Sequence, residues 1–283
     1  MNPSLSVITP SYNQAEFIER TLRSVFEQNY RQLEYIVVDG GSTDGSVDVI
    51  KRYSDELTWW VSEADRGQAH ALNKGIERAT GTYVAYINSD DYYLPGAFEQ
   101  AVRVLESSGA AWAAGSCRYV DADDQLLDVW HPHVPPSRRH RWLIGPWGVP
   151  QAATFWRTEV FKRYGAFRED MHYVFDTEFG LRLLFQGLSP AQVDGELATR
   201  VVHSHAKSWD RTEFTREGRR LIGLFYSLLT REERLMLRGS LLLRKLGWYR
   251  ALGLLGQLRR RGPLRSQAAQ IGNRHGNANS WRA

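Results

Sequence analysis

Apolar positions in the first hundred residues follow two alternating periods. Short runs that are apolar at almost every position are typical of strands buried on both faces, and they are found at 5–9, 33–39, 58–63 and 82–87. Between them, apolar residues recur at helical spacing or follow good capping residues, which predicts helices at 17–26, 42–53, 71–79 and 97–105. Strand–helix alternation with short connections predicts an α/β fold with a mostly parallel sheet flanked by helices. Ligands of such a sheet bind at the carboxyl ends of its strands.

The pattern loosens after Ser107. AAWAAG and CRYVDADDQLLDVW predict short strands and a hairpin, and a loop rich in Pro, His and Arg follows at 132–141. Helices are expected at TEVFKRYG and DTEFGLRLLFQG, because each ends in a glycine, and a last strand at TRVVHSH.

The C-terminal part of the chain differs in charge from the rest. Of the 36 Lys and Arg residues 17 lie from Lys207 onward, with 5 of the 32 Asp and Glu residues, so this part carries +12 and the first 206 residues carry −8. Leu221–Leu258 is leucine-rich and predicted to be helical, and the composition of 262–283 predicts disorder. An apolar helix face with basic flanks is typical of binding to an anionic membrane surface. A helical pair packed on the rest of the protein or on a second subunit has the same pattern.

Composition narrows the class of protein. One cysteine, Cys117, excludes an internal disulfide framework and a cysteine-rich zinc site, and it fits a reducing compartment. We expect neither a signal peptide nor a membrane span, since no charged segment precedes a long apolar one and no window reaches 18 uncharged apolar residues. The sequence also lacks a G-x-G-x-x-G after the first strand and a P-loop. Charge alone permits nucleic-acid binding, but no motif supports it.

Polar clusters follow the predicted strands, at Thr9–Asn13, Asp39–Ser42, Glu63–Gly67 and Asn88–Asp91. In a parallel sheet these clusters meet at one edge. Asp90 and Asp91 offer the oxygen ligands that Mg²⁺ and Mn²⁺ prefer, with a substrate diphosphate completing the shell. The alternative is a cap on the helix that follows. Asp39 can accept hydrogen bonds from a nucleotide base or ribose, or it can simply form a turn.

Two segments carry a resemblance to a known family. SVITPSYNQAEFIERTLRSVFEQNYRQLEYIVVDGGSTDGS and SEADRGQAHALNKGIERATGTYVAYINSDDYYLPGAF resemble the N-terminal half of a family-2 glycosyltransferase with the GT-A fold, from about residue 6 to 98. The residues that this resemblance places against a nucleotide-diphosphate sugar are Thr9, Pro10, Tyr12, Asn13, Asp39, Arg66, Asn73, Lys74 and Asp90. Among them, Asp39 contacts the base and Asp90 the ribose. The D-x-D motif appears as Ser89-Asp90-Asp91, so the resemblance gives the metal to Asp91.

A transferase of this kind needs a base that deprotonates the acceptor hydroxyl, on the side opposite the departing diphosphate. HYVFDTEFGLRLL resembles the later E-D motif of the family, with Phe175 in place of the acid. Asp176 is the predicted base and Glu178 the second choice. An N-cap aspartate followed by an acid in the first turn has the same pattern, and both interpretations can hold.

Two further segments complete the resemblance. GVPQAATFWRTEVFKRYGAF resembles the acceptor side of the cleft, which makes Trp147 and Gln151 candidates for holding an acceptor sugar; packing in the core is the alternative for the tryptophan. HSHAKSWD is similar to a late histidine motif near the diphosphate or metal. His205 is therefore the predicted second metal ligand and His203 the weaker candidate, although a lone histidine is more often structural.

The resemblance implies an inverting glycosyltransferase dependent on Mn²⁺ or Mg²⁺. It would move one sugar from a nucleotide-diphosphate sugar (UDP-sugar favoured, dTDP- and GDP-sugars as alternatives) to a saccharide or lipid-linked acceptor in surface polysaccharide synthesis, on the cytoplasmic face of the membrane. The predicted organisation is a GT-A catalytic domain at 1–206, with nucleotide-sugar (1–107) and acceptor (108–206) halves, and a basic helical extension at 207–261. The alternative is a binding or scaffold protein that has lost transfer, because Ser89 and Phe175 replace acids. The sequence leaves the oligomeric state open.

Overall fold

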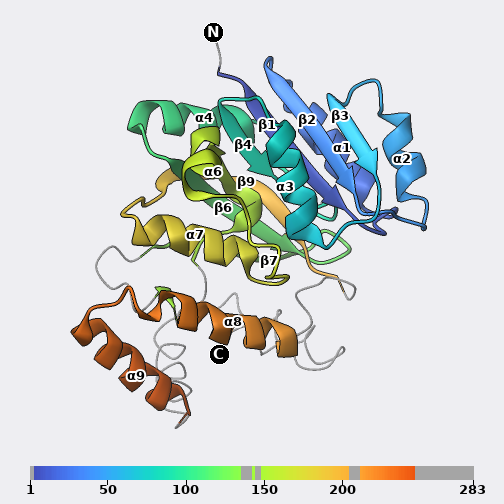
Figure 1. Ribbon diagram of the computed structural model, residues 1–283. Coiled ribbons are helices and arrows are strands. Elements are labelled where there is room, and N and C mark those ends of the chain that lie inside the picture. The colour runs from blue at the N-terminus through green and yellow to red at the C-terminus, as the bar shows by residue number, and fades with distance from the viewer. Residues whose placement is uncertain (1–2, 135–141, 144–147, 204–210, 246–283) are drawn as a thin grey trace.

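The chain folds into one twisted sheet covered by helices on both faces, with two further helices packed below it (Figure 1). The computed structural model describes residues 3–134, 142–143, 148–203 and 211–245. Its first half consists of β1 (Leu5–Ser11), α1 (Ile18–Phe26), β2 (Leu33–Asp39), α2 (Ser46–Arg52), β3 (Trp59–Ser62), α3 (Gln68–Arg78) and β4 (Tyr83–Tyr86). The remaining elements are β5 (Tyr92–Tyr93), α4 (Ala97–Ser108), β6 (Trp112–Val120), β7 (Leu126–Trp130), the 3₁₀ helix η1 (Gln151–Ala153), β8 (Thr154–Arg157), α6 (Thr158–Tyr164), α7 (Phe175–Phe185), β9 (Ala191–Val201), α8 (Arg211–Tyr226) and α9 (Arg231–Lys245).

The strand order is β3-β2-β1-β4-β8-β6-β9-β5, with β7 paired to β6. The first four strands are parallel, whereas β8 is antiparallel to both β4 and β6. The order in which strands are added to the sheet reverses at β1, because β2 lies on one side of it and β4 on the other. Such a switch point opens a crevice at the carboxyl ends of the strands, where α/β proteins bind ligands.

Alternate residues of the strands fill two separate apolar layers. On β1, Val7 belongs to the layer beneath α1, α2 and α4, and Ile8 to the layer beneath α3, α6 and α7. Gly75 of α3 allows that helix to approach β1 closely, since a Cβ there would lie 2.5 Å from the Ile8 side chain. Burial on both faces explains why the parallel strands are apolar at almost every position.

The predicted α/β architecture is confirmed, and the first four strands and helices lie within a few residues of their predicted bounds. The later strands differ more. AAWAAG and CRYV form the single strand β6, and the last strand begins at Ala191, well before the predicted TRVVHSH, and ends at Val201. The short strands β5 and β8 were not predicted, because their length gives too few positions for a period to show.

The predicted C-terminal helix is two helices, the first of which begins earlier, at Arg211. Leu221 and Phe225 of α8 are buried in the same apolar layer as α7, and the Phe225 ring stacks on Phe185 with centroids 4.9 Å apart. α8 is therefore packed on the body of the protein, while the domain boundary at residue 206 stays a prediction. No described helix is long and apolar enough to cross a membrane. Residues 246–283, which include the predicted disordered tail, lie outside the described residues.

The centre of this apolar layer provides a test of the fold. Phe179 of α7 is fully buried, and its ring stacks on Phe161 at 4.9 Å and meets Phe167 at 5.0 Å. We expect Phe179→Ala to lower the free energy of unfolding by about 3–5 kcal/mol in urea denaturation, because it leaves a cavity between α6 and α7. The matched control is Phe214→Ala on α8, where the side chain is 47% exposed. An equal loss in both variants would contradict the packing described.

Candidate functional site

The carboxyl ends of β1, β2 and β3 lie side by side. In the parallel register Ser11 pairs with Asp39, and Asp39 pairs with Ser62. The Asp39 carboxylate is fully buried and accepts hydrogen bonds from Ser62 Oγ at 2.7 Å, Ser42 Oγ at 2.5 Å and the amides of Gly41 and Ser42. Asp39 therefore shapes the loop that follows β2, as the turn interpretation predicted. Its contact with a base stays a prediction.

The loop after β1 is tied to the loop after β2. The Asn13 amide donates to Ser42 Oγ at 2.7 Å, and Asn13 Oδ1 accepts from the Thr43 amide at 2.9 Å. Tyr12 is 62% exposed beside Gly40, where a Cβ would lie 3.3 Å from the Tyr12 ring and 2.7 Å from the Asp65 carboxylate. A glycine at position 40 thus lets Tyr12 and Asp65 approach the same point. Two of the predicted residues therefore lie at the open edge of the sheet.

Thr9 and Pro10, which the resemblance places against the nucleotide, are buried within β1. The Thr9 hydroxyl lies 3.0 Å from the Tyr35 hydroxyl in the core. In this conformation the Thr9 side chain is directed away from the open edge of the sheet, and its contact with a nucleotide remains a prediction.

The paired aspartates have different surroundings. The side chain of Asp90 is 18% exposed, and its Oδ2 lies 3.0 Å from Nε2 of His203, which also stacks on the Phe17 ring. Asp91 is 2% exposed, and its Oδ1 accepts a hydrogen bond from the Val201 amide at 3.1 Å. Burial raises the pKa of Asp91 well above its ordinary range, and the charge of Asp90 adds to this effect. The accessible carboxylate is thus Asp90, the reverse of what the metal assignment from the D-x-D resemblance requires.

Arg200 of β9 is the cation of this part of the site. Its charge lowers the pKa of Asp91 against the larger effect of burial. Burial lowers the pKa of Arg200, but its interactions with Tyr119, Asp91 and Asp90 together raise this pKa above the usual range. Sequence reasoning did not find this residue. A lone arginine in the apolar run of the last strand was the signal that could have indicated it.

Asp176 lies in the first turn of α7, beside the same arginine. Its Oδ1 accepts a hydrogen bond from the Thr177 amide at 2.6 Å. Burial raises the pKa of Asp176, and the Thr177 hydrogen bonds and the charge of Arg200 oppose that effect. Burial raises the pKa of Tyr86, at the end of β4, and the nearby charges of Asp176 and Asp91 add to this effect. Asp176 and the aspartate pair therefore border one common region at the end of β4 and β9.

Glu178, the second choice for a base, has another role. It is 4% exposed and forms an ion pair with Arg182. The Arg182 guanidinium also donates to the carbonyls of Tyr164 at 2.7 Å and Ala166 at 3.1 Å, so the pair fastens α7 to the end of α6. This geometry favours Asp176 over Glu178 as the base.

The three predicted residues Arg66, just before α3, and Asn73 and Lys74, within α3, are all engaged with other groups of the protein. Arg66 pairs with Glu169, and Lys74 Nζ donates to Glu63 at 2.7 Å. Asn73 Nδ2 donates to the Phe167 carbonyl at 2.9 Å, and its Oδ1 accepts from the amide of the same residue. In this conformation Asn73 holds the segment that leads to α7.

Gln151 of η1 reaches the aspartate region from the other half of the chain. Its Nε2 donates to the Tyr86 carbonyl at 3.0 Å, and its Oε1 accepts from Asn88 at 3.4 Å. Trp147 and His205, predicted to bind the acceptor and the metal, lie outside the described residues. His203, the weaker metal candidate, is the histidine that the structure places against Asp90.

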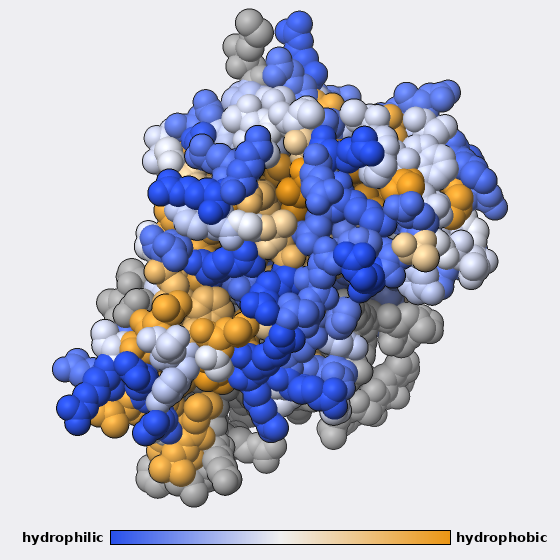
Figure 2. Space-filling view, in the orientation of Figure 1, coloured by the Kyte–Doolittle hydropathy of each residue, from blue (hydrophilic) through white to orange (hydrophobic). Residues whose placement is uncertain are grey.

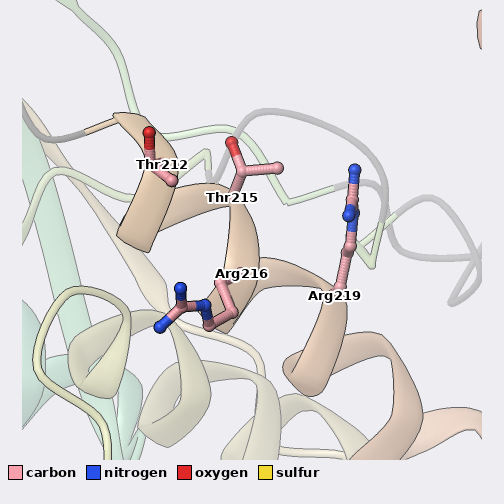
Figure 3. A pocket seen from close by; sticks show the side chains of 4 residues that line it. All are labelled: Thr212, Thr215, Arg216 and Arg219. Atoms are coloured by element: carbon pink, nitrogen blue, oxygen red, sulfur yellow. The ribbon is translucent and has the colours of Figure 1, made fainter.

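A separate hollow lies on α8. Thr212, Thr215, Arg216 and Arg219 line it, and Figure 3 shows Arg219 on the same side of the helix as the two threonines, with Arg216 turned away. None of the site residues above lines this hollow. The hollow is partly lined by basic side chains of α8, and it is separate from the region around Asp90 and Asp176.

The chain is similar to known proteins over most of its length. The family model of glycosyl transferase family 2 matches residues 6–170. An uncharacterized glycosyltransferase of Mycobacterium tuberculosis is 35% identical over 185 residues, which cover 64% of this chain and 68% of the relative. TuaG of Bacillus subtilis, which is named for teichuronic acid biosynthesis, is 38% identical over 138 residues, which cover 48% of this chain and 54% of TuaG.

Solved structures share the fold. TarS of S. aureus has a TM-score of 0.58 at 20% identity, over 78% of this chain and 39% of TarS. The mannosyltransferase PcManGT of Pyrobaculum calidifontis has a TM-score of 0.56 at 18% identity, over 97% of this chain and 88% of that one. The chain thus spans much less than the whole of TarS. With more than half of its residues matched by the family model, and with its mixed sheet and carboxylates at the strand ends, the chain belongs to glycosyltransferase family 2.

Proposed function

We propose that the protein transfers a single sugar from a nucleotide-diphosphate sugar to a hydroxyl of a saccharide or lipid-linked acceptor, with inversion of the anomeric carbon. The observation that carries this proposal is the common region bordered by Asp176 and by the Asp90–His203 pair, with Arg200 close enough for its charge to interact with those of Asp90, Asp91 and Asp176. In this proposal Asp176 acts on the acceptor hydroxyl, and the Asp90–His203 pair acts at the diphosphate of the donor.

The donor is proposed to be a UDP-sugar first and a GDP-sugar second. Structures of TarS hold UDP and UDP-GlcNAc, and PcManGT holds GDP-mannose with Mn²⁺. The support in this chain is the edge formed by Tyr12, Asn13 and the Asp39 loop, where an exposed ring lies beside two loops that hydrogen bonds hold in place. A dTDP-sugar would present the same diphosphate and ribose-like groups.

The residues at the aspartate pair fit a divalent cation. A carboxylate and an imidazole face each other at Asp90 and His203. With phosphate oxygens completing the shell, the carboxylate suits Mn²⁺ or Mg²⁺, and the imidazole favours Mn²⁺ of the two. No group of three or more His, Cys, Asp or Glu side chains that could hold a metal occurs among the described residues, and we propose that the donor diphosphate supplies further ligands. We assign the cation to Asp90 and His203, and to Asp91 the role of fixing β9 through Val201. When bound, the cation would offset the charge of the departing diphosphate.

The transfer is a single displacement at the anomeric carbon. The acceptor oxygen forms a bond to the anomeric carbon while the bond between that carbon and the diphosphate oxygen breaks. The proton of the acceptor hydroxyl passes to Asp176, and the nucleoside diphosphate leaves. Oδ1 of Asp176 is held by the Thr177 amide, which orients the carboxylate. Burial raises the pKa of Asp176, which makes its carboxylate a stronger base than that of an exposed aspartate.

Asp176→Asn tests the base. We expect kcat to fall by on the order of 10²–10⁴ with little change in UDP or GDP binding, because the amide keeps the shape and cannot take the proton. The assay is release of nucleotide from UDP-GlcNAc, UDP-glucose, UDP-galactose and GDP-mannose with Mn²⁺, with and without a saccharide acceptor. Asp194→Asn, an exposed aspartate on β9, is the matched control and should be fully active.

The pH dependence gives a second test of the same residue. Asp176 must be ionised to act, and burial raises its pKa, so kcat/KM should fall as the pH drops through a pKa higher than the ordinary value of about 3.9 for aspartate. If the wild type and Asp176→Asn are equally inert on every donor but both bind nucleotide, the protein is a binding or scaffold member of the family.

The metal assignment is tested by thermal shift with UDP and GDP, with and without Mn²⁺. We expect Mn²⁺ to increase the shift given by nucleotide in the wild type, since both ligands bind only the folded state. Asp90→Asn and His203→Ala should lose this increment, whereas Asp121→Asn, on the loop between β6 and β7, should keep it. Loss of the increment in folded Asp91→Asn but not in Asp90→Asn would restore the assignment of the metal to Asp91.

We also propose that α8 and α9 place the protein on an anionic cytoplasmic membrane surface, where a lipid-linked acceptor of surface polysaccharide synthesis would be presented. Figure 2 shows apolar surface gathered over α9. The exposed large apolar side chains there and on the adjoining part of α8 are Leu224, Leu228, Leu235, Met236, Leu241, Leu242 and Leu243. Exposed arginines flank them at 216, 219, 231 and 238. Apolar area beside basic groups is what an anionic leaflet recognises.

The membrane proposal is tested by co-sedimentation with vesicles of phosphatidylglycerol and phosphatidylcholine at low salt. The full chain should pellet with them, and Leu235→Glu combined with Leu242→Glu should bind at least about tenfold more weakly, because two exposed leucines that would insert into the leaflet are replaced by carboxylates that the anionic lipids repel. Leu126→Glu, 60% exposed on β7, is the matched control. Equal binding by all three proteins, or none by the wild type, would leave α9 as a surface for protein contacts only.

A further inference from the structure

A buried glutamate of α8 binds the backbone that leads into α7. Glu217 is 8% exposed, and its carboxylate accepts three hydrogen bonds from consecutive amides: His172 and Tyr173 at 2.7 Å each, and Val174 at 3.1 Å. A buried carboxylate is costly unless its oxygens are hydrogen-bonded, so this contact fixes both partners.

The contact lies directly before the start of α7. α7 begins at Phe175, and its N-cap residue Val174 provides no side-chain hydrogen bond. Buried amides need acceptors, and a negative charge near this end of a helix is favoured by the helix dipole. Here both come from a residue 43 positions further along the chain. Asp176 follows two residues after the last of the three amides.

The same face of α8 holds the segment at a second point. Arg220, one turn after Glu217, donates to the Asp170 carbonyl at 2.7 Å and pairs with the Asp170 carboxylate. Arg168 and Arg220 together hold the pKa of Asp170 well below its ordinary range, with the Arg168 hydrogen bond contributing most. The arginine thus fastens the segment on the side of α8.

The opposite side of the segment is held from α3. Asn73 binds the Phe167 backbone in both directions, and Arg66 pairs with Glu169. Residues 167–174 therefore lie between two rigid elements, and their course is set by side chains rather than by regular structure of their own. The family match ends at residue 170, before α7 and α8.

We propose that Glu217 is a positioning residue for catalysis: through the amides of 172–174 it fixes the start of α7 and so the place of the Asp176 carboxylate. This inference rests on the proposed role of Asp176 as the base. It also gives the C-terminal helix α8 a part in the chemistry, in addition to any contact with a membrane.

The central test is Glu217→Gln in the full chain. The amide keeps the size of the side chain but removes the charge and one acceptor, so the turn before α7 loosens. On whichever of the four donors is turned over, we expect kcat to fall by on the order of 10- to 100-fold while the KM for the donor and the affinity for UDP or GDP with Mn²⁺ change less than about twofold. Glu217→Asp, which keeps the charge on a shorter side chain, should recover part of kcat.

The matched control is Glu213→Gln, an acid one turn earlier on α8 that pairs with the exposed Arg216. It should keep the wild-type kcat. A purely structural role of Glu217 would lower the active fraction, seen as fewer nucleotide sites per chain with kcat per site unchanged. That result, or a wild-type kcat in Glu217→Gln, would overturn the inference. Asp176→Asn is measured alongside: if it keeps full activity, the proposed function fails instead, whatever Glu217→Gln does.

Hydrogen exchange of the wild type provides a measurement that needs no substitution. The amides of 172–174 precede α7 and have Glu217 as their acceptor, so they should exchange at least about tenfold more slowly than in an unstructured chain. If Glu217→Gln does not fold, the kcat of Glu217→Asp and this protection decide the question. Exchange at the rate of an unstructured chain would show that the hydrogen bonds between Glu217 and the amides of 172–174 do not form in solution.

Discussion

The hydrogen bond from the Val201 amide to the buried Asp91 carboxylate joins the two halves of the sheet at the edge where the site lies. Asp91 follows β4, the last of the four parallel strands of the first half, whereas Val201 ends β9, which comes from the second half of the chain. β5 pairs with β9 directly after Asp91, through Tyr92 and Thr199. Because a buried carboxyl group needs hydrogen-bond partners, this contact helps to fix the end of β9, and with it the positions of Arg200 and His203.

Charge balance around Arg200 explains how several carboxylates coexist in a small region. Burial disfavours the ionised forms of Asp91 and Asp176, and repulsion by Asp90 adds to this effect at Asp91; the charge of Arg200 favours the ionised form of both. Asp90 is more accessible and has His203 as its neighbour. Carboxylates that look equivalent in sequence therefore have different roles. Asp91 connects two strands, Asp90 faces the proposed cation, and Asp176 is the proposed base. Environment, not residue type, separates their roles.

The part of the site around Asp176 depends on α8, which belongs to the segment predicted as a C-terminal extension. The segment before α7 has no regular hydrogen bonding of its own, and α3 and α8 hold it from two sides through Asn73 and Glu217. α8 also buries Leu221 and Phe225 in the layer beneath α7. The helix that begins the basic extension is thus part of the architecture that orients Asp176, whereas the surface of α9 remains exposed and apolar.

The sequence by itself determined the α/β fold, the first four strands and helices, and the polar clusters at the strand ends, because local periodicity records which face of each element is buried. It also indicated Asp176 at a helix start. Only the tertiary structure decided that His203 lies against Asp90, that Glu178 pairs with Arg182, that Arg200 lies close to the aspartates, and that Glu217 binds the backbone before α7. These relations join residues far apart in the chain, and a pattern read over neighbouring positions contains no information about which distant charge satisfies which buried group.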